Sequence, residues 1–198
     1  RGLGDVYKRQ EPITSLTGGV PVHIATKVED DFRLRADQLR AAITPRTKLL
    51  ILPYPNNPTG GVMDAKEKGV PGELKMAPEM VRAVCEEAHR MGYRVAAHVE
   101  SPEGVRVALE NGVDSIEHGA KPDAQILALF REKGAFLCTT ISPALPCALF
   151  DRSITNATEV EQFNGNVVFE GIIACAKAAL ENGIPVVLGN DVGCPWIK

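Results

Sequence analysis

The sequence lacks the features that mark membrane-spanning, secreted and nucleic-acid-binding proteins. No apolar run approaches the ~20 residues that cross a bilayer, and the N-terminus does not show the charged, apolar and small-residue order of a signal peptide. The net charge is −3 without any basic block, so no nucleic-acid or membrane partner is indicated. The five cysteines form no C-x-x-C pair, which argues against a disulfide framework or a structural zinc knot. We expect a cytoplasmic protein whose cysteines are small core residues.

The chain contains three different kinds of sequence in succession. Its 198 residues, 44% apolar and 24% charged, have the composition of a soluble protein with one packed core. Residues 1–10, however, show neither helical nor strand periodicity. They resemble translated sequencing-adapter or cloning sequence, and we leave them out of the fold prediction.

Residues 11–60 form the second segment. A Gly-Gly turn precedes an apolar stretch that predicts a strand over residues 19–25, and the spacing of Leu39, Ala42 and Ile43 predicts an amphipathic helix over 35–43. Residues 47–53 predict a buried strand that runs into the Asn-Asn-Pro-Thr-Gly sequence of residues 56–60.

This order resembles the middle of the large domain of a class I/II pyridoxal-phosphate aminotransferase. The shared motifs are Gly-Gly-x-Pro-Val, Ile-Thr-Pro-Arg-Thr-Lys and Asn-Pro-Thr-Gly. The resemblance implies that Asn57 donates its amide N–H to the phenolic oxygen of pyridoxal phosphate; the alternative is a turn residue before proline. No downstream lysine has the context of a Schiff-base lysine, and no aspartate is placed to hold the pyridinium nitrogen. The expected cofactor contact is therefore vestigial.

Residues 61–198 follow a different pattern, typical of a parallel α/β protein. Four helical runs each stop at a glycine and are followed by a short apolar run without alternation, as in strands buried on both faces. The glycines are Gly92, Gly112, Gly134 and Gly183, and the predicted strands are 93–97, 113–116, 135–141 and 184–188. The repeated order of strand, helix, glycine and strand predicts parallel βαβ units, here part of a (β/α)8 TIM barrel.

Polar residues recur where three of these strands end: His98, His118 and Asp191. In an α/β barrel the carboxyl ends of the strands form the active-site edge. Two imidazoles and a carboxylate converging there suit a divalent metal such as zinc. A metal-bound hydroxide could attack an amide carbonyl, with Asp191 carrying the proton to the leaving nitrogen. Taken singly, each histidine could be a hydrogen-bonded structural residue, and Asp191 could be a turn or helix-cap residue.

Residues 61–198 also resemble the second half of an amidohydrolase-superfamily barrel, in the branch of imidazolonepropionase and prolidase-like enzymes. The matching motifs lie at residues 60–63, 87–92, 97–98, 116–119 and 189–193. The resemblance implies that His98 and His118 are metal ligands from the fifth and sixth strands. It also implies that Asp191, from the eighth strand, is both a metal ligand and the catalytic proton shuttle.

Two departures from this family affect the expected activity. The His-x-His pair of the first strand is absent, and so is the bridging lysine expected shortly before Gly-Gly-Val-Met. The two family resemblances meet at residues 59–63, a short sequence that could occur in either family. We interpret the join as an assembly or amplification product rather than a natural fusion. We expect an incomplete zinc site and open sheet edges that promote aggregation or self-association.

Three functions are compatible with this sequence. The leading hypothesis is an inactive fragment of a metal-dependent amidohydrolase acting on C–N bonds, whose parent hydrolyses a small amide, dipeptide or cyclic amide. The second is a fragment of a pyridoxal-phosphate-dependent aminotransferase. The third is a non-catalytic half-barrel module that pairs with a second chain.

Overall fold

The chain divides into two compact units, Arg1–Val62 and Met63–Lys198. The structure, a computed structural model, describes residues 14–25, 36–51, 74 and 76–191. The division falls within the stretch 59–63 where the sequence predicts the join between two families. The three-segment assignment stays a prediction, because residues 1–13 and 52–73 lie outside the described part of the chain.

In the first unit the predicted helix is present and the predicted strands are not. Helix α2 spans Ala36–Ala42, within the predicted range 35–43. Residues 20–25 and 47–51 form no strand, and Leu49 is 73% exposed, so the prediction of a buried strand there is wrong. A strand needs a hydrogen-bonding neighbour, and the described residues of this unit supply none.

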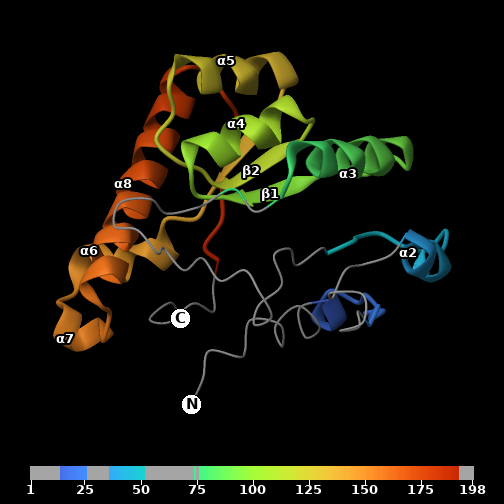
Figure 1. Cartoon of the computed structure of the whole chain (residues 1–198), viewed down its shortest axis with the longest axis horizontal. Coiled ribbons are helices and arrows are strands. Elements are labelled where there is room, and N and C mark those ends of the chain that lie inside the picture. The colour runs from blue at the N-terminus through green and yellow to red at the C-terminus, as the bar shows by residue number, and fades with distance from the viewer. Residues whose placement is uncertain (1–13, 26–35, 52–73, 75, 192–198) are drawn as a thin grey trace. The chain divides into compact units, whose positions relative to one another are not determined.

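The second unit alternates helices and strands. Its elements are α3 Pro78–Arg90, β1 Ala96–Val99, α4 Pro102–Glu110, β2 Ser115–His118, α5 Ala124–Lys133, β3 Phe136–Thr139, the 3₁₀ helix η2 Ser142–Ala144, α6 Leu145–Leu149, α7 Arg152–Thr155, α8 Glu159–Glu181 and β4 Val186–Leu188. The strands form one parallel sheet in the order β1-β2-β3-β4. Figure 1 shows β1 and β2 side by side next to α4. The predicted parallel α/β arrangement is therefore confirmed. None of the helices in the described part of the chain has the length and apolar character that a bilayer crossing requires.

All four predicted glycine stops end a helix in the same way. Gly92, Gly112, Gly134 and Gly183 have φ between 64° and 97°, the left-handed conformation that glycine adopts without strain. Each glycine N–H bonds back three residues, and the N–H of the next residue bonds back five, as Tyr93 does to the Ala88 carbonyl. This is the Schellman motif.

The Schellman motif accounts for the first residue by which each strand begins later than predicted. The first apolar residue after each glycine still donates its N–H to the preceding helix, so it cannot enter the sheet ladder. Strand β1 accordingly starts at Ala96 rather than at Tyr93, and β2 starts at Ser115 rather than at Val113.

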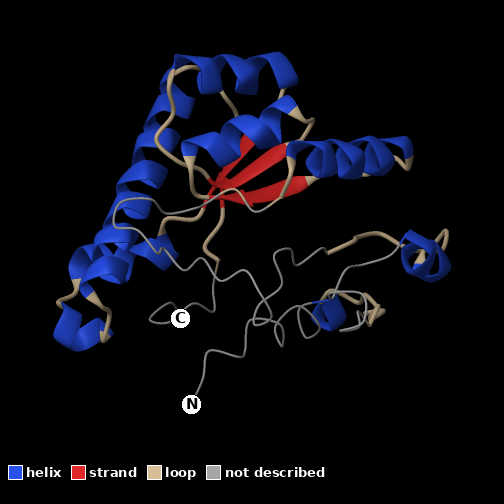
Figure 2. Ribbon diagram, viewed as in Figure 1, coloured by secondary structure: helices blue, strands red, loops and turns tan. Residues whose placement is uncertain are grey.

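The sheet has a packed face and an open face. Ile116 and Leu137 are fully buried on the packed face, together with Leu109, Ile126 and Phe130 of the helices. Figure 2 shows helices lying along one side of the strands. The open face carries His98, Glu117 and Cys138, which lie in one register row across β1, β2 and β3. Because side chains alternate along a strand, the polar residues of this row project away from the core.

We predict that the full chain self-associates. Within the described residues β1 and β4 each have a single strand neighbour, and Leu188 at the end of β4 is 92% exposed. Unpaired strand edges with exposed apolar side chains template pairing with other chains. Size-exclusion chromatography with light scattering should give broad masses above 21.3 kDa.

Leu188→Lys should reduce this association, whereas Leu180→Lys, at an exposed position on α8, should not. A sharp, cooperatively melting monomer of 21.3 kDa would contradict the prediction.

Candidate metal centre

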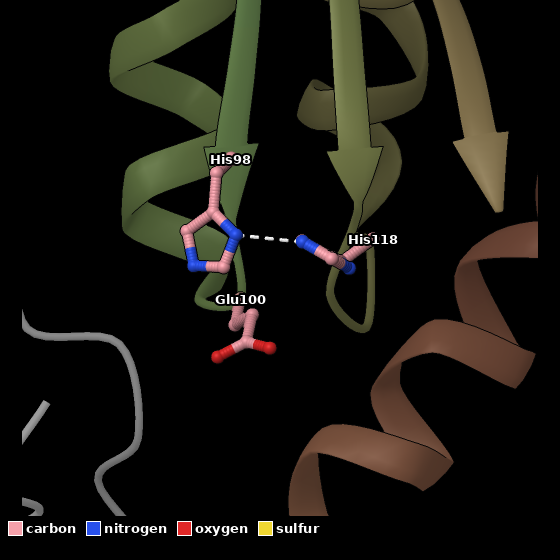
Figure 3. A group of neighbouring side chains, drawn as sticks. All are labelled: His98, Glu100 and His118. Atoms are coloured by element: carbon pink, nitrogen blue, oxygen red, sulfur yellow. Dashed lines mark hydrogen bonds between the residues drawn. The ribbon is translucent and has the colours of Figure 1, made fainter. Parts of the chain in front are cut away.

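Two histidines meet at the carboxyl ends of neighbouring strands. His98 Nδ1 lies 2.6 Å from His118 Nε2, and the two rings stand edge to face with centroids 4.4 Å apart. Figure 3 shows both rings below the ends of β1 and β2. Parallel pairing places these strand ends side by side, since His98 is in register with Glu117, the residue before His118. The structure thus brings together two of the three metal ligands expected from the sequence.

The His118 side chain lies on the opposite face of the sheet from the one that strand alternation would give it. Its register partner Val99, and Ile116 two residues before it, both pack with the core. Regular alternation would place His118 there as well. A φ of 70° at His118 breaks the alternation and brings the ring to His98 and Thr140.

His118 is held as a neutral imidazole. Its side chain is buried, and burial, with a smaller contribution from His98, lowers its pKa to about 3. Its Nδ1 is hydrogen-bonded to the Thr140 hydroxyl and its Nε2 faces His98. A neutral imidazole keeps one nitrogen lone pair, which is what a metal ligand requires.

Glu100 completes the cluster and was not among the residues expected from the sequence. Ligand atoms of His98, Glu100 and His118 all lie within 4.8 Å of one another, and the half-buried carboxylate lies beyond the end of β1 (Figure 3). Burial and the charge of Asp191 raise its pKa, whereas His98 lowers it. Glu100 follows His98 by two residues, the spacing that places side chains on one face of a strand, and this spacing could have identified it.

Asp191 follows β4 and is exposed, with φ 48°. It is outside the group of three donors, although its charge acts on Glu100. Among the described residues, three other than glycine have positive φ: His118, Asp191 and Asn156, which ends α7. Left-handed backbone at polar residues is a recurrent feature of functional sites, and two of the three examples fall on predicted ligands.

The cluster fits a metal, whereas no comparable group among the described residues fits pyridoxal phosphate. Two imidazole nitrogens and a carboxylate oxygen form a donor set that suits zinc. Asn57, the predicted pyridoxal-phosphate contact, lies outside the described residues, and the described residues of the first unit contain one lysine, Lys48. One lysine without a defined partner does not make up a cofactor site.

Comparison with known sequences identifies the family of the N-terminal half. The family model of class I and II aminotransferases matches residues 6–114, more than half of the chain. The chain belongs to this family. Its match begins at residue 6, inside the segment that we expected to be adapter-like.

The curated relatives are much longer than the matched region. Aspartate aminotransferase of Geobacillus stearothermophilus is 37% identical over 103 residues, which is 50% of this chain and 26% of the relative. Aromatic-amino-acid aminotransferase 2 of Thermococcus litoralis is 46% identical over 56 residues, 28% of this chain and 14% of the relative. The chain thus spans about a quarter or less of these aminotransferases.

Comparison with solved structures gives a second similarity, to proteins of another kind. A protein designated a prolidase, from Bifidobacterium longum, matches 70% of this chain and 34% of its own length, with TM-score 0.62 and 36% identity. A Xaa-Pro dipeptidase with methionine bound in its active site matches 65% of this chain and 32% of its own, with TM-score 0.55 and 27% identity. Together with the family match, these similarities confirm the predicted chimera of aminotransferase and prolidase-like amidohydrolase segments.

The two similarities overlap, because together they cover more than the whole chain. The family match extends through α3, β1 and α4 to residue 114, elements that also form part of the parallel sheet unit. A helix, strand and helix in succession is common to many α/β folds, so this stretch can satisfy both comparisons.

We predict that Gly119→Ala destabilises the turn that positions His118. Gly119 has φ 83°, and an added Cβ would lie 2.9 Å from Cys175 Sγ and 3.0 Å from Leu137 Cδ1. Backbone strain and overpacking together should lower the free energy of unfolding by about 2–4 kcal/mol. Urea unfolding followed by circular dichroism measures this loss.

Gly134→Ala is the matched control. Gly134 also has positive φ, but an added Cβ meets nothing within 4 Å, so strain alone should cost about 1–2 kcal/mol. Equal losses in the two variants would show that the packing against Cys175 is unimportant.

Proposed function

We propose that Met63–Lys198 is part of a (β/α)8 barrel and carries the metal-binding half of an amidohydrolase that cleaves C–N bonds. The observation that supports this function is the cluster of His98, Glu100 and His118 at the carboxyl edge of a parallel sheet. That edge is where barrel enzymes place their catalytic residues. The proposed setting is the cytoplasm, and the four described cysteines are free thiols.

The proposed metal is zinc, held by His98, Glu100 and His118, with Asp191 nearby. A bound zinc would polarise a carbonyl and lower the pKa of its water toward neutrality. Burial keeps the ring of His118 neutral and available as a ligand. Asp191 is exposed and its charge reaches Glu100, so its carboxylate can take a proton at the edge of the cluster and deliver it to a leaving nitrogen.

The proposed substrate class of the parent protein is a small amide, dipeptide or cyclic amide. Two of the structural neighbours are a prolidase and a Xaa-Pro dipeptidase, so dipeptides ending in proline are the first substrates to test. The chain as it stands is proposed to be inactive, because the sequence has no His-x-His pair to complete the ligand set.

We predict weak zinc binding that depends on the histidine cluster. Three donors can hold an ion, but an incomplete set leaves it exchangeable. Isothermal titration of chelator-treated protein should detect one zinc, lost on exhaustive dialysis. His98→Ala and His118→Ala should each weaken binding at least about tenfold, whereas His23→Ala, in the first unit, should not change it.

Stoichiometric zinc that survives exhaustive dialysis would show that the ligand set is more complete than proposed. Zinc binding unaffected by His98→Ala and His118→Ala would place the ion elsewhere and remove the basis of the proposed function.

We predict no hydrolysis of Xaa-Pro dipeptides above the rate of a zinc-containing buffer control. The reason is the incomplete ligand set rather than failure to fold, so the assay is run on fractions whose circular dichroism shows the α/β signature. Turnover that disappears with His118→Ala would overturn the assignment as inactive.

A fragment of a pyridoxal-phosphate-dependent aminotransferase is the second candidate, favoured by the family match over residues 6–114. Its proposed cofactor contact is Asn57. Incubation with pyridoxal phosphate tests it: a Schiff-base absorbance band that Asn57→Ala weakens would support this candidate, and the spectrum of free cofactor would oppose it.

A further inference from the structure

One buried hydroxyl lies against the histidine cluster without being a ligand. Thr140 follows β3, is 5% exposed, and its hydroxyl is hydrogen-bonded to Nδ1 of His118. It lies two residues after Cys138 and therefore on the open face, the same face as His98. His118 thus has a fixed polar partner on the nitrogen that points away from His98.

The Thr140 hydroxyl is itself held by packing. The Cγ2 methyl of Thr140 lies so close to Gly189 that a Cβ added there would approach it to 2.9 Å. Threonine has few allowed χ1 rotamers, so a methyl placed against Gly189 leaves the hydroxyl directed at His118. The carboxyl ends of β2, β3 and β4 therefore cooperate to orient one imidazole ring.

From this geometry we propose that Thr140 is a positioning residue that prepares His118 to bind a metal. A neutral imidazole carries its proton on one of two nitrogens. When the Thr140 hydroxyl accepts the Nδ1–H of His118, Nε2 keeps its lone pair and faces His98 and Glu100. Hydrogen-bond partners of metal-binding histidines fix the tautomer and ring orientation in this way. The inference rests on the proposed metal site and adds a residue to it.

The neighbouring Thr139 offers a matched control. It is buried about as deeply as Thr140, but its hydroxyl donates to the Val187 carbonyl at 3.5 Å rather than bonding to His118. Thr140→Val and Thr139→Val both replace a buried hydroxyl by a methyl of similar size. Only Thr140→Val removes the acceptor from His118, whereas Thr140→Ser keeps it.

Zinc affinity, measured on the full chain by competition with a chelating dye, tests the proposal. Thr140→Val should weaken zinc binding about 10- to 100-fold, the usual effect of losing such a partner. Thr139→Val should stay within about twofold, and Thr140→Ser should lie closer to the unsubstituted chain than Thr140→Val does. Equal affinities for all variants, or equal losses in both valine variants, would overturn the proposal.

Two further measurements separate positioning from a purely structural role. Melting in the presence of chelator reports stability alone; a lower melting temperature for Thr140→Val with unchanged zinc affinity would assign Thr140 a structural role. Should Thr140→Val not fold, nitrogen-15 NMR of the zinc-loaded, unsubstituted chain decides. A proton on Nδ1 of His118 supports the proposal, and a proton on Nε2 overturns it.

The same zinc titration distinguishes failure of the metal site from failure of the positioning role of Thr140. If the unsubstituted chain binds no zinc, the metal site fails and the role of Thr140 fails with it. If zinc binds and depends on His118 but not on Thr140, the proposed function stands and only the positioning role is overturned.

Discussion

Parallel strand pairing is the constraint on which the rest of the second unit depends. Two parallel neighbours cannot be joined by a tight turn, so α4, α5 and α8 each carry the chain back to the starting edge of the sheet. Those helices cover one face and create the buried core. The same constraint brings every carboxyl end to one edge, where His98, Glu100 and His118 converge although 18 residues separate the last two.

The metal-binding cluster departs from regular strand geometry at His118, one of its proposed ligands. His118 leaves the strand with a left-handed backbone, and Gly119 continues in the same region of φ. Gly119 is packed so closely against Cys175 of α8 that a side chain would not fit without movement. The packing of Gly119 against α8 thus stabilises a turn that β2 alone would not favour, and the ring of His118 depends on Cys175, more than fifty residues downstream.

Local rules predicted the second unit well and the first unit poorly. Helix ends follow from glycine chemistry within a few residues, so Gly92, Gly112, Gly134 and Gly183 were identified correctly. Strand starts were misplaced by one residue or more, and the Schellman hydrogen bond of Tyr93 to the helix before it accounts for the first of these. His98 and His118 were found through their places at strand ends, whereas Glu100 was missed although its spacing of two residues from His98 places the two on one face of a strand. Strands at 20–25 and 47–51 failed as predictions because a strand is defined by its neighbour, which sequence pattern alone does not supply.

The stretch α3–β1–α4 shows how regular local structure can conceal the chimeric origin of a chain. The family model of aminotransferases covers it by sequence, and a helix, a capped turn and a strand in succession are common to many α/β folds. A chain can therefore change ancestry ahead of such a stretch while the helix caps and the periodicity of the stretch itself stay regular. Such a change removes strand pairings between residues far apart in the sequence. The sign of a hybrid of this kind is therefore unpaired strand edges far from the point where the two sequences are joined.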